Sequence, residues 1–336
     1  MYQEIFEEVK QKGCARCATV LEGPYAGSKY LFTEEGGQCW GAMDEDAWEK
    51  MRAVLLTVPK TAVSDCQGTP VLVEWIYDRP RMVICGGGHV SSYVCQLGKM
   101  LGFHVTVMDD RPEFACTERF PEADRCICQD LSHLADEVPP HPNTYYVVVT
   151  RGHAHDETCV RQVLQRPYRY LGMIGSKTKV ARTKENLLMD GYTKEQVDSI
   201  YAPIGLKLGG QLPEEIAVSI AAEIIQVKNK RYTDTLDEKI ESAVEEKEEG
   251  VMVTIIAKHG SSPRGTGSKM LVCSGQQIYG SVGGGAVEYE AIQEAKRLMG
   301  QRKVQSLCAS YVLNQEQAKN LGMVCGGEIQ VLFECL

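Results

Sequence analysis

Residues 81–110 read RMVICGGGHVSSYVCQLGKMLGFHVTVMDD, and this stretch decides the fold of the middle of the chain. A buried-strand pattern at 81–85 meets a run of glycines that opens a helix pattern, and a second strand at 104–110 ends in acidic residues. A strand, a glycine turn with its helix and a second strand make the first βαβ unit of a doubly wound parallel sheet. The sequence therefore predicts an α/β protein with a Rossmann-like domain.

Strand and helix patterns continue to alternate after this unit. The runs TYYVVVT at 144–150 and YLGMIGS at 170–176 predict two more central strands. Helices that fill the intervals are predicted at 156–166, 177–190 and 213–228. The polar segments YDRP and NKRYTDTLDEK bound the pattern on either side, so we expect the Rossmann-like domain to cover residues 79–230.

The remaining sequence contains a repeat. The matching segments are GSKYLF at 27–32 with GSKMLV at 267–272, QCWG at 38–41 with QIYG at 277–280, and CQGTPVLVEW at 66–75 with CGGEIQVLFE at 325–334. The first copy lacks the SSPR segment and carries MDED where the second carries VGGG. We therefore expect a duplicated α+β unit, with residues 1–78 as a degenerate scaffold and residues 231–336 as the intact functional copy. The two copies are expected to pack together.

Composition limits the class of protein. The chain has 336 residues, 43% of them hydrophobic, and a formal net charge of −9, which argues against nucleic acid as a partner because phosphate binding needs a basic face. No signal pattern opens the chain and no apolar run approaches ~18 residues, so no membrane segment and a cytoplasmic location are expected. The 14 cysteines are dispersed. They predict reduced thiols, and no metal site is expected because Cys14-x-x-Cys17 has no partner pair.

The glycine turn after the first strand is a candidate nucleotide site. Gly86 and Gly88 are the glycines that a tight turn and a close approach to a phosphate need, and Ser91 stands in place of the third. His89, inside the turn, is a candidate phosphate contact. Asp109 lies at the end of the second strand, where a carboxylate can accept hydrogen bonds from ribose hydroxyls. The alternative is a turn that serves only the packing of its helix.

A second candidate loop, TRGHAHD at 150–156, lies at the carboxyl end of another strand, where open α/β sheets bind their ligands. Arg151 offers a fixed positive charge. His153, His155 and Asp156 are candidate acid–base groups or metal ligands, although the sequence shows no third ligand for a metal beside the H-x-H spacing. Alternatively, Asp156 caps the following helix and the histidines are ordinary loop residues.

A third loop, GSKTK at 175–179, repeats this arrangement. A strand ends, and Ser176 and Lys177 open a helix whose free amides face the same edge of the sheet. A serine cap alone is weak support for a site, but three loops at one edge support one another.

The intact copy contains the loop KHGSSPRGTGSKM at 258–270. Its candidate anion-binding residues are Ser261, Ser262, Arg264 and Lys269. Glycines between them let the backbone turn its amides inward as a nest. Because the first copy folds without SSPR, a turn alone does not explain this segment, and we expect a clamp for an anionic cofactor.

Two further motifs of the intact copy complete the candidate surface. The sequence GSVGGGAVEYEAI at 280–292 places glycines before a helix, whose amides can hold negative charge with no side chain in the way. The candidate residues there are Gly283, Gly284, Gly285 and Glu288. In MVCGGE at 323–328, Cys325 precedes two glycines whose amides would lower the pKa of its thiol, so Cys325 is a candidate catalytic group. The alternative for Cys325 is a small buried hydrophobic residue.

These motifs resemble those of a known family. GSSPR, GSKMLV, GSVGGGAVE and MVCGG resemble the XdhC/CoxI domain of xanthine dehydrogenase accessory proteins, while ICGGGHV, VTVMDDRPEFA, ERFPEAD, TRGHAHD, YLGMIGSKTK and PIGLKLGGQLPEEIAVSIAAEI resemble their Rossmann domain. The order differs from the usual one, because the intact XdhC/CoxI domain follows the Rossmann domain instead of preceding it.

The resemblance implies a maturation factor that binds the molybdenum cofactor (molybdopterin), protects it and helps deliver its sulfurated form to a molybdenum hydroxylase such as xanthine dehydrogenase. It implies an accessory protein more than a stand-alone enzyme. The protein is expected to form a homodimer and to have a cysteine desulfurase as a partner. The loops at 261–269, 280–288 and 323–327 would form the cofactor-handling surface.

One alternative function stays open. Gly86, Gly88 and Asp109 could serve an NAD(P)-dependent oxidoreductase, with a histidine of the 153–155 loop as acid–base group. The missing third glycine and the glycine-rich second domain favour the maturation factor, with a nucleotide such as NAD(P) left open at the Rossmann edge.

Overall fold

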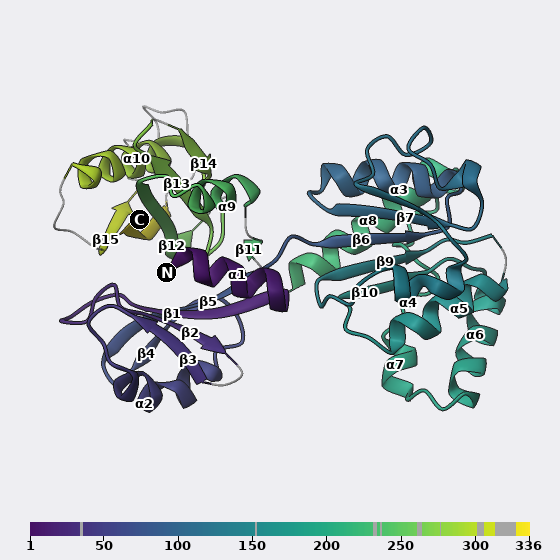
Figure 1. The fold of residues 1–336 in the computed structure, drawn as a ribbon, viewed down its shortest axis with the longest axis horizontal. Coiled ribbons are helices and arrows are strands. Elements are labelled where there is room, and N and C mark those ends of the chain that lie inside the picture. Colours follow the sequence, from purple (N-terminus) through teal and green to yellow (C-terminus); the bar gives the residue numbers. More distant parts are fainter. Residues whose placement is uncertain are drawn as a thin grey trace. The chain divides into compact units, whose positions relative to one another are not determined.

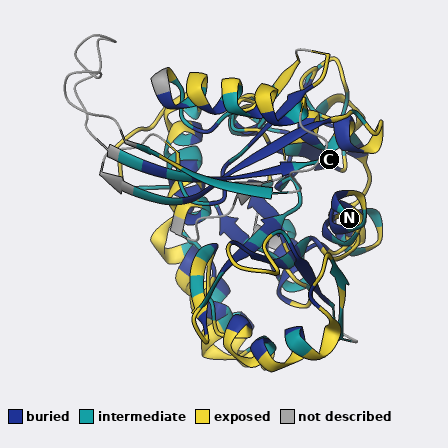
Figure 2. Ribbon diagram, turned by 90° about the vertical axis from the view of Figure 1, so that its left-hand side faces the viewer, coloured by how far each residue is buried: buried dark blue, intermediate teal, exposed yellow. Residues whose placement is uncertain are grey.

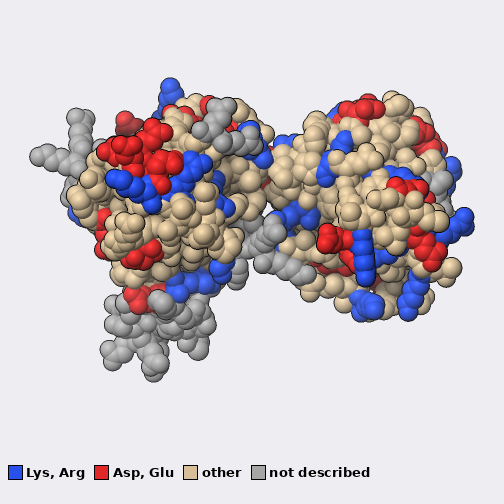
Figure 3. All heavy atoms as spheres, turned by 90° about the horizontal axis from the view of Figure 1, so that it is seen from below, with Lys and Arg blue, Asp and Glu red and all other residues tan. Residues whose placement is uncertain are grey.

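The computed structural model describes residues 1–33, 36–151, 153–230, 234–235, 237–260, 264–275, 277–300, 306–312 and 327–336. The chain forms two compact units, one of Met1–Asp78 with Tyr232–Leu336 and one of Arg79–Arg231 (Figure 1). Among the helices in these ranges, none combines the length and apolar character that a membrane span requires. The face drawn in Figure 3 carries acidic and basic side chains interspersed on both units.

The unit of Arg79–Arg231 is built on a parallel sheet of five strands in the order β10-β9-β6-β7-β8. The strands are β6 (Arg81–Cys85), β7 (His104–Asp109), β8 (Arg125–Cys128), β9 (Thr144–Val148) and β10 (Tyr170–Met173). The order reverses between β6 and β9, which is the arrangement of the Rossmann fold and places its ligand crevice beside those two strands. The predicted fold class is confirmed.

Helices cover both faces of this sheet. Along β6, Met82 and Ile84 pack on one face with α3 (His89–Met100) and α8 (Pro213–Lys230). Val83 and Cys85 pack on the other face with α5 and its neighbours. The helices near that second face are α4 (Leu134–Glu137), α5 (His153–Leu164), α6 (Lys177–Met189) and α7 (Lys194–Asp198). The unit also has short 3-10 turns at Pro112–Phe114 and Leu131–His133. Burial on both faces explains the continuous apolar runs of the strands.

The unit of Met1–Asp78 with Tyr232–Leu336 consists of two copies with the same topology. Copy one comprises α1 (Tyr2–Lys12), β1 (Cys14–Val20), β2 (Lys29–Thr33), β3 (Gly36–Trp40), α2 (Glu45–Leu56), β4 (Ala62–Cys66) and β5 (Thr69–Tyr77). Copy two comprises α9 (Glu238–Glu245), β12 (Gly250–Gly260), β13 (Lys269–Cys273), β14 (Ile278–Gly280), α10 (Gly285–Met299), β15 (Ser306–Val312) and β16 (Gly327–Cys335).

Both copies form antiparallel sheets. Their orders, β3-β2-β1-β5-β4 and β14-β13-β12-β16-β15, match strand for strand, and the short β11 (Asp234–Thr235) adds to the first sheet beside β5. The repeat visible in the sequence is therefore a repeat of structure.

The inner faces of these two sheets pack against each other. Leu21 and Leu72 of copy one share a core with Ile256 and Leu332 of copy two, and α1 and α9 lie together in a neighbouring core. The outer faces are covered by α2 in copy one and by α10 in copy two. Figure 2 shows the strands mostly buried, with exposed residues concentrated on the helices and loops. We call the junction between the two sheets the seam.

Strand register identifies equivalent residues across the seam. Thr19 lies opposite Lys29 in copy one, as Thr254 lies opposite Lys269 in copy two. Glu74 lies two residues beyond the partner of Thr19 on β5, and Glu334 lies two residues beyond the partner of Thr254 on β16. Each copy therefore contributes one Thr, one Lys and one Glu at equivalent positions of its inner face.

Candidate functional site

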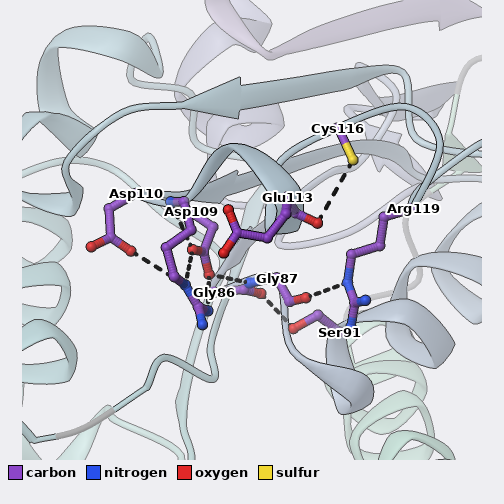
Figure 4. Close-up of polar contacts among 9 residues, drawn as sticks. Gly86, Gly87, Ser91, Asp109, Asp110, Glu113, Cys116 and Arg119 are labelled. Atoms are coloured by element: carbon purple, nitrogen blue, oxygen red, sulfur yellow. Dashed lines mark hydrogen bonds and ion pairs between the residues drawn. The ribbon is translucent and has the colours of Figure 1, made fainter.

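The glycine turn after β6 requires its first two glycines. Gly86 has φ +105°, in the left-handed region, and a Cβ on Gly87 would lie 1.9 Å from the carbonyl oxygen of Phe114. A Cβ on Gly88 would meet nothing within 4 Å, so this residue faces open space at the start of α3. The Ser91 hydroxyl donates a hydrogen bond back to the Gly86 carbonyl (Figure 4). Ser91 thus closes the turn where the usual motif has its third glycine.

Asp109 fixes this turn to β7. Its carboxylate accepts a hydrogen bond from the Gly87 amide at 2.7 Å (Figure 4). It also accepts from Arg111, through the backbone amide at 3.1 Å, Nε at 2.8 Å and Nη2 at 3.0 Å. Burial raises the pKa of Asp109, but the Arg111 and Gly87 hydrogen bonds outweigh it and hold that pKa below its usual value. A ribose hydroxyl would have to compete with these four donors.

A pocket of about 350 Å³ opens at the switch point between β6 and β9. It brings together five of the residues predicted from the sequence, namely Gly86, Gly88, His89, Asp109 and Arg151. Arg111 and Phe114 are among the other residues that line it, and the guanidinium of Arg111 lies 3.6 Å from the centre of the Phe114 ring. Arg111 and Phe114 belong to the segment DDRPEF, which begins at the last residue of β7. From this segment only Asp109 was predicted as a candidate binding residue.

The 150–156 loop is built around a buried carboxylate. Asp156 is fully buried, accepts from the Thr150 amide at 3.2 Å and from the Thr150 hydroxyl at 2.6 Å, and forms an ion pair with Lys179. These contacts join the end of β9 to α5 and α6. Neither Asp156 nor the half-buried His155 is among the described lining residues of the 350 Å³ pocket, and the side chain of His153 lies outside the described residues. The acid–base role of this loop stays a prediction.

In the third predicted loop, at 175–179, Ser176 forms a helix cap. The Ser176 hydroxyl accepts from the Lys179 amide at 3.2 Å and caps α6. Lys177 is exposed at the first turn of that helix. Neither is among the described residues that line the pocket.

In copy two, the predicted clamp is only partly described. Ser261, Ser262 and Cys325 lie outside the described residues, and Arg264 is exposed. The Lys269 ammonium lies 2.5 Å from Glu74 Oε1 and 2.9 Å from the Thr254 hydroxyl, so it already has two partners within the protein.

The glycine turn before α10 differs from the prediction. The Glu288 carboxylate reaches back into it and accepts from the Ser281 hydroxyl at 2.6 Å and from the amides of Val282 and Gly284, each at 3.1 Å. The expectation that no side chain occupies this turn is therefore wrong. Gly283, Gly284 and Gly285 have positive φ, and the turn they form holds the protein's own carboxylate.

Four charged residues meet in the seam as crossed ion pairs. Lys29 Nζ lies 2.9 Å from Glu334 Oε1 and 2.6 Å from the Thr19 hydroxyl, and Lys269 repeats these contacts with Glu74 and Thr254. Each lysine thus binds the threonine of its own copy and the glutamate of the other. Burial lowers the pKa of Lys29, but Glu334 and neighbouring groups outweigh it and the pKa lies above its usual value.

A cavity of about 110 Å³ lies in the seam beside one of these pairs. Copy one supplies Thr61, Glu74 and Trp75, while copy two supplies Arg264 and Lys269 among others. Copy one, expected as scaffold, therefore lines a candidate site. The sequence carried no signal for this, because the contacts join residues almost 200 positions apart. Within the described ranges, no group of three or more His, Cys, Asp or Glu side chains is placed to hold a metal ion.

Comparison with known proteins agrees with this architecture. Residues 82–224 match the model of the XdhC Rossmann domain, and residues 243–309 match the model of the XdhC and CoxI family. A protein of Bacillus subtilis named as a probable xanthine dehydrogenase subunit is 32% identical over 204 residues, and the uncharacterized protein YqeB of Escherichia coli is 30% identical over 168 residues. These matches cover 60% and 49% of the chain, and 58% and 31% of the respective relatives.

A solved structure shares the fold. The crystal structure of a xanthine dehydrogenase from Bacillus halodurans matches with a TM-score of 0.53 at 21% identity, over 73% of this chain and 67% of that one. Two domain models of one family match successive parts of the chain, and together they span more than half of it. The chain belongs to the XdhC and CoxI family.

Proposed function

We propose that this protein is an accessory factor for a molybdenum hydroxylase, of which xanthine dehydrogenase is the representative class, and that it binds the molybdenum cofactor during maturation of that client. The observation that carries the proposal is the seam cavity of the XdhC/CoxI unit, with Arg264 exposed at its edge. The names of the relatives support the choice of client.

The residues of the seam fit the chemistry of this cofactor. A pterin carries N–H groups and a phosphate on a side chain, and the cavity offers a carboxylate, Glu74, hydroxyls such as Ser281, and a cation, Arg264. When bound, the cofactor would supply the redox-active metal that the client needs. The residues of this chain would hold its organic part and exclude water from it.

Sulfuration and delivery belong to the same proposal. Cys325, next to the intact glycine motif, is the candidate sulfur carrier, with a cysteine desulfurase as the donor of sulfur. Replacing it, Cys325→Ser, is expected to leave cofactor binding unchanged and to lower activation of the client. Unchanged activation would return Cys325 to a structural role.

The proposal is tested by purifying the full chain from cells that make the cofactor. Bound molybdenum is measured by mass spectrometry, bound pterin by the fluorescence of its oxidised product, and transfer by activation of a cofactor-free hydroxylase. We expect molybdenum and pterin in equal amounts, together with activation. A preparation that retains neither and activates nothing would refute the proposal.

A second candidate function rests on the pocket at the switch point. Its glycine turn, the open face of Gly88 and the two arginines Arg111 and Arg151 would suit a nucleotide such as NAD(P). Titration with NADH and NADPH, followed by a search for substrate-linked turnover, tests it. Tight binding with turnover, and no cofactor retention, would favour the oxidoreductase over the maturation factor.

A further inference from the structure

We propose that the seam cavity binds one edge of a planar heteroaromatic ring through N–H groups that donate to Glu74. This inference rests on the proposed function, in which the ring is the pterin of the molybdenum cofactor, and it assigns the ring to a site that the two copies build together.

The protein contains its own example of such an occupant. Glu334 is the counterpart of Glu74 across the seam, and the phenol of Tyr2 donates to Glu334 Oε2 at 2.5 Å. Tyr2 is only 4% exposed, so its ring fills the space beside that carboxylate. The six-membered ring of Tyr2, from copy one, therefore already packs beside a buried glutamate and donates a hydrogen bond to it.

The helix of copy two begins differently at this place. By the strand equivalence of Thr19 and Thr254, the counterpart of Tyr2 is Asp237, the N-cap residue, so α9 begins one residue later and has no aromatic ring at this position. The cavity lies against Asp237 and Ile240 at the N-terminal end of α9 and against Glu74. Broken symmetry between the copies thus leaves space at the position where copy one places an aromatic ring.

The size of the cavity suits one ring. Its volume of about 110 Å³ is somewhat below the ~150 Å³ of an engineered cavity that takes up benzene. A single ring edge can enter, and the remainder of a larger ligand would extend toward the surface. Arg264, exposed at the edge, is placed to meet an anionic group on that remainder.

The charges in the cavity favour a ring with donors over a bare anion. Burial raises the pKa of Glu74, but Lys269 and Lys29 outweigh it, so the pKa lies below its usual value and the carboxylate is ionised. A free phosphate would meet this carboxylate and that of Asp237. Of the two described cations that line the cavity, Lys269 is already bound by Glu74 and Thr254, and Arg264 is exposed. A pterin instead presents a ring N–H and an amino group side by side, which suits a carboxylate.

Calorimetric titration of the full-length protein with pterin, and separately with inorganic phosphate, tests the inference. Ile240→Phe should fill the cavity and weaken pterin binding about tenfold or more, the loss expected when a hydrogen bond to a charged group can no longer form. The matched control, Tyr2→Phe, removes the phenol from the other glutamate and should change the affinity less than about twofold. Phosphate should bind weakly and leave pterin binding unchanged.

Hydrogen exchange on the wild-type protein gives an answer that does not depend on a variant. Pterin should protect amides at 74–76, 237–240 and 267–269, and leave the turn at 86–91 unprotected. Pterin binding that Ile240→Phe leaves intact, or protection confined to 86–91, would overturn the inference. If the cell-derived protein carries the cofactor in such a case, the proposed function stands without this site; if it carries none, the function itself falls.

Discussion

The crossed ion pairs of the seam allow a sharp test. Lys29 is fully buried and binds Glu334 and Thr19, so Lys29→Met removes one charge and leaves a carboxylate whose side chain is 4% exposed. The loss of one partner from a buried pair costs about 3–5 kcal/mol, since the remaining charge is neither hydrated nor paired. Tyr2 still donates to Glu334, which places our expectation at the lower end, about 3 kcal/mol.

Tryptophan fluorescence reports this unit alone. The three tryptophans of the chain, Trp40, Trp48 and Trp75, all lie in copy one, so a urea titration followed by their emission measures the unfolding of the unit that contains the seam. The matched control is Lys10→Met, because Lys10 is 46% exposed and pairs with Glu241 on the surface. A surface pair contributes at most about 1 kcal/mol. Equal effects of the two variants would refute the reasoning.

Three further outcomes are expected. Acid should unfold the seam unit as the pH falls below ~4.3, the usual pKa of a glutamate. The pKa of Glu74 is lowered in the folded state, so its charge stabilises the fold at neutral pH and this stability is lost when the carboxylate is protonated. Tryptophan emission during an acid titration measures the unfolding, and an unchanged emission down to pH ~2 would contradict the prediction. Gly87→Ala should destabilise the Rossmann unit, as measured by calorimetric unfolding, because the added Cβ meets the carbonyl of Phe114. Gly88→Ala is the control, since its Cβ would face open space, and it should leave the stability within about 0.5 kcal/mol. Glu288→Gln should free part of the turn before α10 and strengthen the binding of anions there, whereas unchanged sulfate or phosphate affinity would show that the turn is closed for other reasons.

The fold could be predicted because its signals are local. The glycine turn at 86–88 stands between two apolar strands, and the period of the pattern changes there within a few residues. The repeat is visible because GSKYLF and GSKMLV keep the same order of residue types. Both signals depend on neighbours in sequence, and both predictions of architecture are confirmed.

The site was less predictable because its side chains are satisfied by residues remote in sequence or by competing neighbours. The pattern around Lys269 indicates a free cation, but Glu74 binds it from the other copy. The glycines at 283–285 indicate an open turn, but Glu288 returns from the first turn of α10 to fill it. In the same way, Asp109 is a candidate acceptor for ribose hydroxyls, but its carboxylate already forms an ion pair with Arg111. In each case the sequence correctly indicates a group that can bind an ion. The residue of the protein that already binds this group cannot be identified from the local sequence.

The loss of symmetry in the seam bears on stoichiometry. Two identical single-copy subunits related by a twofold axis would present two equal cavities, because every contact in such an interface occurs twice. Here both halves belong to one chain, and Tyr2 closes one position while the other stays open beside Glu74. Under the proposed site, duplication separates a structural half from a ligand-binding half, and saturation is expected at one ligand per chain.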